Sequence, residues 1–358
     1  MPTLEAFNLA QNQKVKSFLA SQVAAMMGRK FEEEDWAKVY RAGKGILGGG
    51  WSNPSIDIVH GALGVEQKMI RYNDKKALRE ACGTALMHPA GTRAIRIPPE
   101  PNPTLAARNI LRQYAELIEE RTSIVRIVHQ YHHNVLSRVD AIAELCRHAR
   151  MKPEGADKFL PRQLLPVGQA EDAIDMRNGW LLWQSDLREF LYFEEAMTVP
   201  IADDYVAEWH ESGGGRRRKS RTLWVYHKAE GDKRYSITTD AGAKIQPYFK
   251  VPPATDANLC HWIVQGERAE TGHVRVWLTR QTADLLKARI GSIETSVLSS
   301  AILGANLSTL GGGIADSAFG PLAVDILIDP KAYTALNTSC SAVSDEHRFR
   351  MLAELFGG

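Results

Sequence analysis

Hydrophobic residues recur at helical spacing over much of the first two hundred positions. In residues 4–27 the apolar side chains fall three and four positions apart, which is the pattern of an amphipathic helix. The same pattern predicts further helices over residues 31–41, 74–88 and 104–150, and a helix-rich block over residues 169–196. The first part of the chain is therefore expected to be rich in helix.

Alternating apolar and polar residues, with many β-branched side chains, predict strands between and after these helices. Three strands are expected over residues 55–59, 64–71 and 92–97. Beyond residue 200 the pattern changes, and short strands are predicted over residues 222–228, 235–239, 244–249, 260–264, 274–278 and 322–328, with one helix over residues 281–290. The sequence therefore predicts an α/β fold that divides into residues 1–204 and a β-rich region of residues 205–358.

Composition and charge narrow the possible classes of protein. The chain has 358 residues, of which 44% are hydrophobic and 24% charged, so it can bury a large core. Its net charge is only +2, so any contact with nucleic acid must come from local patches. The four cysteines are far apart and form no CxxC pair, which fits a reducing cytoplasm. Residues 1–29 lack a signal-peptide core and residues 295–315 are too polar to span a bilayer, so a cytoplasmic protein without membrane association is expected.

Three residues indicate a specific chemistry, namely Asp57, Glu66 and Lys68. Glu66 and Lys68 are two positions apart on a predicted strand, so they project from the same face. A hairpin through residues 60–63 would bring Asp57, on the neighbouring strand, beside Glu66. Carboxylate oxygens are suitable ligands for Mg²⁺, and the ion stabilises charge on a phosphoryl group while a lysine orients or deprotonates the attacking water. The set predicts phosphodiester hydrolysis at a sheet edge.

An acid two positions before a lysine is a common pattern, and this chain contains it elsewhere. Asp74-Lys75-Lys76 lies at a polar helix start, and Asp329-Pro330-Lys331 contains a proline that disrupts strand geometry. The alternative interpretation of Glu66 and Lys68 is a solvated strand face with an ion pair to the neighbouring strand. In that case the protein would be a non-catalytic DNA-binding or regulatory protein.

The order of these elements resembles a known enzyme core. Helix 31–41, the strand with Asp57, the strand with Glu66 and Lys68, helix 74–88 and strand 92–97 together resemble the PD-(D/E)XK nuclease superfamily, which includes type II restriction endonucleases and the mismatch-repair nickase. The resemblance covers roughly the first hundred residues. It implies a mixed sheet flanked by helices, in which Asp57 and Glu66 bind Mg²⁺ and Lys68 is catalytic.

The resemblance extends to the first helix of that core. Many members carry a Glu there after a glycine, and Gly28-Arg29-Lys30-Phe31-Glu32 resembles this element. Glu32 is therefore expected to be a further catalytic and metal-binding acid, with Glu33 as the second choice. The family implies a Mg²⁺-dependent, sequence-specific endonuclease that cuts double-stranded DNA as a homodimer on two-fold symmetric sites. A repair-type nickase on the same core is the alternative.

The densest positive run in the chain comprises Arg216, Arg217, Arg218, Lys219 and Arg221, next to three glycines. We expect this run to contact DNA phosphates, with residues 205–358 forming the DNA-recognition region. The alternative is an ordinary solvated loop.

Other motifs give weaker signals. His129, His132 and His133 lack the intervening Glu of a zinc hydrolase, so they are expected to be surface or interface groups. The glycine runs at residues 48–50 and 311–313 lack the lysine of a phosphate-binding loop, so no nucleotide cofactor is expected.

Overall fold

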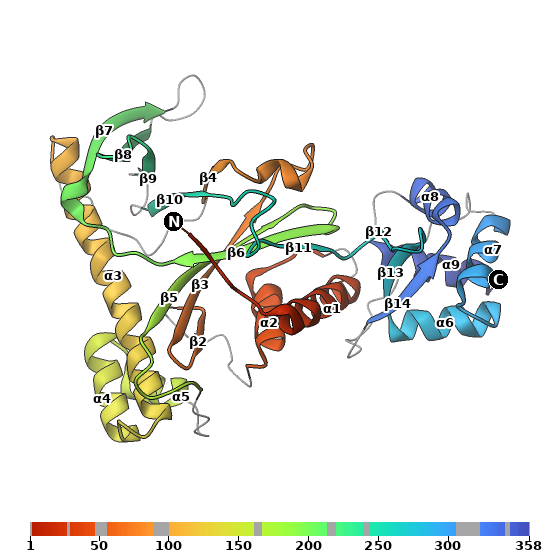
Figure 1. The fold of residues 1–358 in the computed structure, drawn as a ribbon, viewed down its shortest axis with the longest axis horizontal. Helices are drawn as coiled ribbons and strands as arrows, with labels where there is room; N and C mark the ends of the chain where they lie inside the picture. The colour runs from red at the N-terminus through yellow and green to blue at the C-terminus, as the bar shows by residue number, and fades with distance from the viewer. Residues whose placement is uncertain are drawn as a thin grey trace.

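A computed structural model describes most of the chain (Figure 1). The described residues are 2–26, 29–46, 56–88, 100–160, 167–212, 220–238, 244–305, 323–340 and 344–357. They form a mixed α/β protein with three sheets. The helices are α1 (Leu9–Met26), α2 (Glu33–Lys44), α3 (Pro103–His132), α4 (Arg138–His148), α5 (Pro153–Phe159), α6 (Arg280–Ile290), α7 (Thr295–Gly304), α8 (Pro330–Ser339) and α9 (Asp345–Leu355).

A six-stranded sheet forms the centre of the molecule. Its order is β1-β6-β5-β3-β2, and β11 also pairs with β6. The strands are β1 (Thr3–Leu4), β2 (Ile58–His60), β3 (Leu63–Arg71), β5 (Asp175–Trp183), β6 (Glu189–Ala196) and β11 (Cys260–Ile263). Strands β2 and β3 form the predicted hairpin, with Ile58 opposite Val65 and His60 opposite Leu63.

The central strands β3 and β5 are parallel neighbours, in register from Leu63 opposite Asp175 to Arg71 opposite Trp183. A parallel pair requires a long crossover connection, and α3 lies in the connection between β3 and β5. The start of α3 is fixed by Asn102, whose side chain accepts hydrogen bonds from two backbone amides of the first turn. The apolar side of α3 packs into a core that includes Met176 of β5.

The two faces of the central sheet have different neighbours. Helices α1 and α2 pack with Val65, Leu181 and Tyr192 on one face. The opposite face meets α3 and a second, five-stranded sheet of order β4-β10-β9-β8-β7. Its strands are β4 (Ala85–Met87), β7 (Tyr205–Ser212), β8 (Ser220–His227), β9 (Lys233–Thr238) and β10 (Lys244–Lys250).

The C-terminal part of the chain forms a separate unit, at the right of Figure 1. Its sheet has the order β12-β13-β14, and helices α6 to α9 pack around it with their own core. The strands are β12 (Glu267–Arg268), β13 (Val274–Thr279) and β14 (Ala323–Ile328). Contact with α1 includes the ion pair of Lys16 with Glu267 at 2.5 Å.

Two helix predictions were wrong. Residues 74–88 contain only a short 3₁₀ helix, Leu78–Ala81, followed by β4. The block at residues 169–196 forms strands β5 and β6, which are buried on both faces and therefore have continuous apolar runs that periodicity cannot distinguish from a helix. The strand predicted over residues 92–97 lies outside the described residues.

The strands of the second half were largely predicted at their observed positions. The expected division between residues 204 and 205, however, does not separate two sheets. Strand β11 joins the central sheet through β6, and β4 joins the second sheet through β10. Within the described residues, no helix has both the length and the apolar composition needed to cross a membrane.

Candidate active site

Glu66 and Lys68 project from the same face of β3, as the sequence predicts. Lys68 Nζ lies 2.5 Å from Glu66 Oε1, and both side chains are largely buried. A third group, which the sequence did not indicate, completes the cluster: Arg121 Nη2 on α3 lies 3.1 Å from the same oxygen. Both cations therefore contact Oε1 of Glu66, and this carboxylate is held in one position.

Asp57 lies at the edge of β3, immediately before β2. The hairpin pairs β2 with only the first three residues of β3, and Asp57 Oδ2 then accepts a hydrogen bond from the backbone amide of Gln67 at 2.7 Å. The pKa of Asp57 is raised to about 6, chiefly by burial and next by the nearby charge of Glu66, while Lys68 and the hydrogen bond from Gln67 oppose this rise. The charge of Glu66 therefore acts on the Asp57 carboxyl group, which lies at the neighbouring strand edge.

Gln67 points to the opposite face of the sheet from Glu66 and Lys68. Its Oε1 accepts a hydrogen bond from Trp36 Nε1 at 2.9 Å, and its Nε2 donates to Tyr192 Oη at 3.1 Å. All three side chains are buried. This network attaches α2 to the centre of β3, on the face opposite Glu66 and Lys68.

The helix-start acids do not line the Glu66 pocket. Glu32 is at the N-terminus of α2, where it is mostly exposed and forms an ion pair with Lys30 at 3.2 Å. The charge of Glu33 contributes to the raised pKa of Asp57. Of the two, Glu33 is therefore the one whose charge acts on the site, and the assignment of Glu32 stays a prediction.

Glu66 and Lys68 line a pocket of about 380 Å³ between the central sheet, α3 and the second sheet. Arg121, Asn178 and Glu195 also line it, and sequence patterns singled out none of the three. Their signal was hidden because Asn178 and Glu195 fall in the segment interpreted as helical. As strand residues, they lie on the Glu66 face of β5 and β6.

Glu195 is a mostly buried acid in this pocket. Trp180 Nε1 donates a hydrogen bond to Glu195 Oε1 at 3.1 Å. Burial raises the pKa of Glu195, whereas the hydrogen bond from Trp180 and the charge of Arg234 lower it. The balance favours the protonated carboxyl more than in water.

Binding of Mg²⁺ at this site depends on how many metal-binding side chains the site offers. Among the described residues, no group of three or more His, Cys, Asp or Glu side chains is arranged to hold a metal ion. Mg²⁺ commonly keeps several waters and takes one or two carboxylates from the protein together with substrate phosphate oxygens. Asp57 and Glu66 supply that number of carboxylates, and of the two Glu66 lines the pocket.

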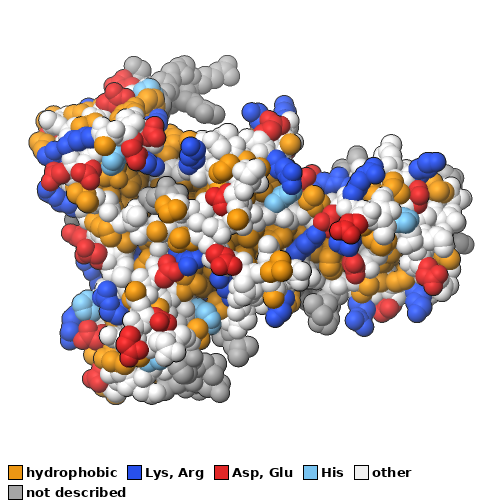
Figure 2. All heavy atoms as spheres, in the orientation of Figure 1, with side chains coloured by type: hydrophobic (Ala, Val, Ile, Leu, Met, Phe, Trp, Pro, Cys, Tyr) orange, Lys and Arg blue, Asp and Glu red, His pale blue; other side chains and the backbone are white. Residues whose placement is uncertain are grey.

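Most of the basic run at residues 216–221 lies outside the described residues. Arg221, on β8, is exposed, and its guanidinium lies over the ring of Trp209, 4.0 Å from the ring centroid. Elsewhere, acidic and basic side chains alternate over the face of the molecule in Figure 2, as expected from the small net charge. Because Arg221 alone of the five basic residues is described, contact of this run with DNA stays a prediction.

The competing acid–lysine triplets have structural roles. Asp329 caps the start of α8, where its Oδ1 accepts a hydrogen bond from Lys331 N at 2.7 Å. Asp74 lies in a turn, where hydrogen bonds from the Ser185 amide and then from Arg71 lower its pKa to about 2. Both acids therefore stabilise local backbone structure through these hydrogen bonds.

Of the three histidines predicted to be surface or interface groups, His129 is buried, whereas His132 and His133 are partly exposed. His129 is 2% exposed, and neither of its ring nitrogens, nor those of His132, has a hydrogen-bond partner within the described part of the chain. The rings of His129 and His133 meet edge to face, with centroids 4.6 Å apart. Burial lowers the pKa of His132, and the nearby His133, His129 and His60 lower it further.

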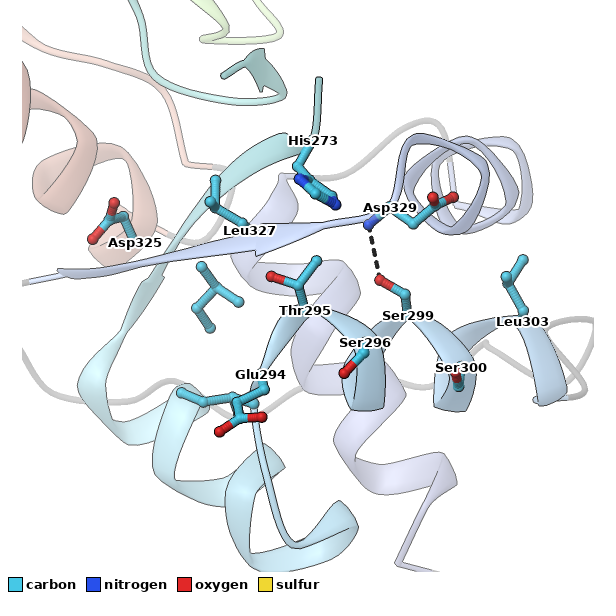
Figure 3. Close-up of a pocket in the computed structure, with 12 residues that line it drawn as sticks. His273, Glu294, Thr295, Ser296, Ser299, Ser300, Leu303, Asp325, Leu327 and Asp329 are labelled. Atoms are coloured by element: carbon cyan, nitrogen blue, oxygen red, sulfur yellow. Dashed lines mark hydrogen bonds between the residues drawn. The ribbon is translucent and has the colours of Figure 1, made fainter. Parts of the chain in front are cut away.

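A second pocket, of about 830 Å³, lies between α7 and β14 in the C-terminal unit. Its lining includes the hydroxyl of Ser299, which accepts a hydrogen bond from the Asp329 amide at 2.8 Å. Figure 3 shows Glu294, Asp325 and Asp329 at separate parts of this pocket, not directed toward one another. The convergent charges of the Glu66 pocket are therefore the better candidate for catalysis.

Comparisons with models of protein families, with curated proteins and with solved structures found no match to this chain.

Proposed function

We propose that the protein is a Mg²⁺-dependent endonuclease that hydrolyses phosphodiester bonds of double-stranded DNA, on a core of the PD-(D/E)XK type. The observation that carries this proposal is the meeting of Glu66 and Lys68 in one pocket, with Asp57 at the adjoining strand edge. These are the two carboxylates and the lysine that such hydrolysis needs.

The order of elements supports the proposed core. A helix, α2, precedes the β2–β3 hairpin that carries Asp57, Glu66 and Lys68, and a crossover through α3 leads to the parallel strand β5. The helix that follows the lysine strand is thus α3, and not the segment at residues 74–88. With α3 in the place of that helix, the resemblance to the PD-(D/E)XK core rests on a mixed sheet flanked by helices.

Each side chain has a role that its contacts support. Asp57 and Glu66 would hold Mg²⁺, which supplies charge stabilisation at the phosphoryl oxygens and makes a water easier to deprotonate. Lys68, held by Glu66, would orient the attacking water and offset the charge that develops on phosphorus. Arg121 lines the same pocket and would hold a non-bridging phosphate oxygen, as guanidinium groups commonly do.

Substrate recognition is proposed from the second half of the chain. Arg216, Arg217, Arg218, Lys219 and Arg221 would contact the DNA backbone and position the duplex. A homodimer would place two such sites around a two-fold symmetric target. Lys75 and Lys76, in contrast, lie in an exposed turn away from the strand face and have no proposed role.

The test is digestion of a defined supercoiled plasmid by the purified protein, with and without Mg²⁺. We expect wild type and Lys75→Ala to cut both strands only with Mg²⁺, and Lys68→Ala to bind DNA without cutting. Cleavage of one strand only would support the nickase. Binding without any cleavage by wild type would contradict the proposal and favour a DNA-binding protein.

A further inference from the structure

Three polar side chains form a row across the central sheet, on the face that lines the Glu66 pocket. Glu66 on β3 is directly opposite Asn178 on β5, and Asn178 is directly opposite Glu195 on β6. Directly opposite residues share a face, and strands are about 4.8 Å apart, so the outer two Cβ atoms are roughly 10 Å apart. All three side chains line the same pocket.

The two outer carboxyl groups have different surroundings. Glu66 has two cationic side chains, Lys68 and Arg121, on one oxygen. One oxygen of Glu195 accepts a hydrogen bond from the indole of Trp180, which is a neutral donor. Tyr114 from α3 and Arg234 from β9 line the same pocket. The Glu66 end of the row is therefore the more strongly cationic end.

We propose that Glu195 is a second catalytic residue of the site, the general acid that protonates the leaving sugar oxygen. This rests on the proposed nuclease function. A phosphodiester placed over Asn178 would have the Glu66–Lys68 pair on the side of the attacking water and Glu195 on the side of the departing oxygen. In-line displacement needs its two catalytic groups at opposite ends of such a row.

The surroundings of Glu195 suit this role. Its carboxyl group is mostly buried, and burial raises its pKa, which keeps a proton available for the transfer. Asn178, between the two acids, would donate its amide to a non-bridging oxygen and hold the diester in the row.

The proposed step balances without a further reactant. The oxygen of water forms a bond to phosphorus while the bond from phosphorus to the sugar oxygen breaks, and the electron pair of that bond goes to the sugar oxygen. The proton of the Glu195 carboxyl moves to the same oxygen, which gives an alcohol. The attacking water loses one proton to solvent, and solvent returns one to Glu195.

The experiment compares leaving groups that need a proton with leaving groups that do not. Glu195→Gln keeps an oxygen for Trp180 but has no acidic proton. We expect it to cleave DNA about 10²-fold more slowly than wild type. On 4-nitrophenyl thymidine phosphodiesters, tested as 3′ and 5′ esters, we expect nearly equal rates, because 4-nitrophenolate leaves unprotonated. If wild type does not accept these esters, DNA with a bridging sulfur at the cleaved bond replaces them, because a thiolate also leaves unprotonated.

Two further measurements separate catalysis from folding and binding. The pH–rate profile of wild type should fall on its alkaline side as the general acid ionises, and Glu195→Gln should lack that fall. DNA affinity measured by fluorescence anisotropy without divalent ions should be the same for both. Glu189→Gln, an acid on the same strand that pairs with His261 outside the pocket, is the matched control and should retain wild-type rates.

The outcomes distinguish this proposal from the function on which it rests. If Glu195→Gln slows both classes of substrate equally, or leaves DNA cleavage unchanged, Glu195 is not the general acid although the nuclease stands. If wild type cleaves no DNA with Mg²⁺, the proposed function itself is wrong and the general-acid role is lost with it.

Discussion

Arg121 on the crossover helix α3 and Glu66 on β3 form an ion pair with 3.1 Å between Arg121 Nη2 and Glu66 Oε1. The two residues are 55 positions apart, and both side chains are largely buried. The ion pair joins the helix that makes the parallel β3–β5 pair possible to the carboxylate proposed to bind the metal. Folding of the crossover and assembly of the site are therefore coupled.

Removal of this guanidinium should weaken the fold. Arg121→Met would leave buried Glu66 paired with Lys68 alone among the described residues, so we expect the free energy of unfolding to fall by about 1–3 kcal/mol. Urea denaturation followed by circular dichroism measures this. Arg126→Met, on the exposed side of the same helix, should change stability by less than about 0.5 kcal/mol. Equal effects of the two substitutions would contradict the coupling.

The network on the far side of β3 should be equally sensitive. Gln67→Leu leaves the buried Trp36 indole without its acceptor, and we expect the free energy of unfolding to fall by about 1–3 kcal/mol. Because the same hydrogen bond anchors the strand that carries Glu66 and Lys68, DNA cleavage should also fall although Gln67 does not line the pocket. Met69→Leu, on the same face, is the control. A stable variant with full activity would show that the network does not position Glu66 and Lys68.

Close packing of α3 on the hairpin depends on a glycine. A Cβ at Gly64 would lie 2.6 Å from Val125 Cγ2 and 2.7 Å from Met176 Sδ. We therefore expect Gly64→Ala to lower stability by about 1–3 kcal/mol through overpacking. A Cβ at Gly155 in α5 meets no atom within 4 Å, so Gly155→Ala should be neutral or stabilising by about 0.5–1 kcal/mol. In thermal denaturation, a lower Tm for Gly64→Ala together with an unchanged or higher Tm for Gly155→Ala would confirm both expectations.

Stability should fall with acidification through the histidine cluster. The pKa of His132 is lowered in the folded state, chiefly by burial, so the unfolded chain binds more protons as the pH falls through about 6.5. Unfolding is therefore favoured below that pH, and the effect is absent above it. His132→Gln should flatten the decline in urea midpoint between about pH 7.5 and 5.5, whereas His148→Gln, a more exposed histidine of α4, should not. An unchanged decline would mean that other groups cause it.

The basic run should act on affinity and not on sequence choice. Replacement of Arg216, Arg217, Arg218 and Lys219 by Ser should weaken binding to all DNA sequences. The slope of log affinity against log salt should become smaller by about 0.9 for each phosphate that the protein no longer neutralises. Removal of Lys287 and Lys331, exposed in the C-terminal unit, is the control. An unchanged slope in the loop variant would exclude this run from the interface.

The amino-acid sequence determined the local features of the site. The i and i+2 spacing of Glu66 and Lys68 on an apolar strand sufficed to place them on one face, and the hairpin before them was predictable because it is short and rich in β-branched residues. The strands of residues 222–278 were found for the same reason, since alternation is a local signal.

Only the tertiary structure decided what surrounds that pair. Strands β5 and β6 are covered on both faces, so their residues form continuous apolar runs, and a run of that kind has no period that reveals a strand. Asn178 and Glu195 lie beside those runs, in the segment interpreted as helical, and Arg121 was one of many polar positions on a long helix. The pairing of β3 with β5, which depends on a crossover of more than a hundred residues, and of β5 with β6 brings all three to the pocket that Glu66 lines. Contacts between distant segments depend on the packing of the whole chain, and no local pattern contains them.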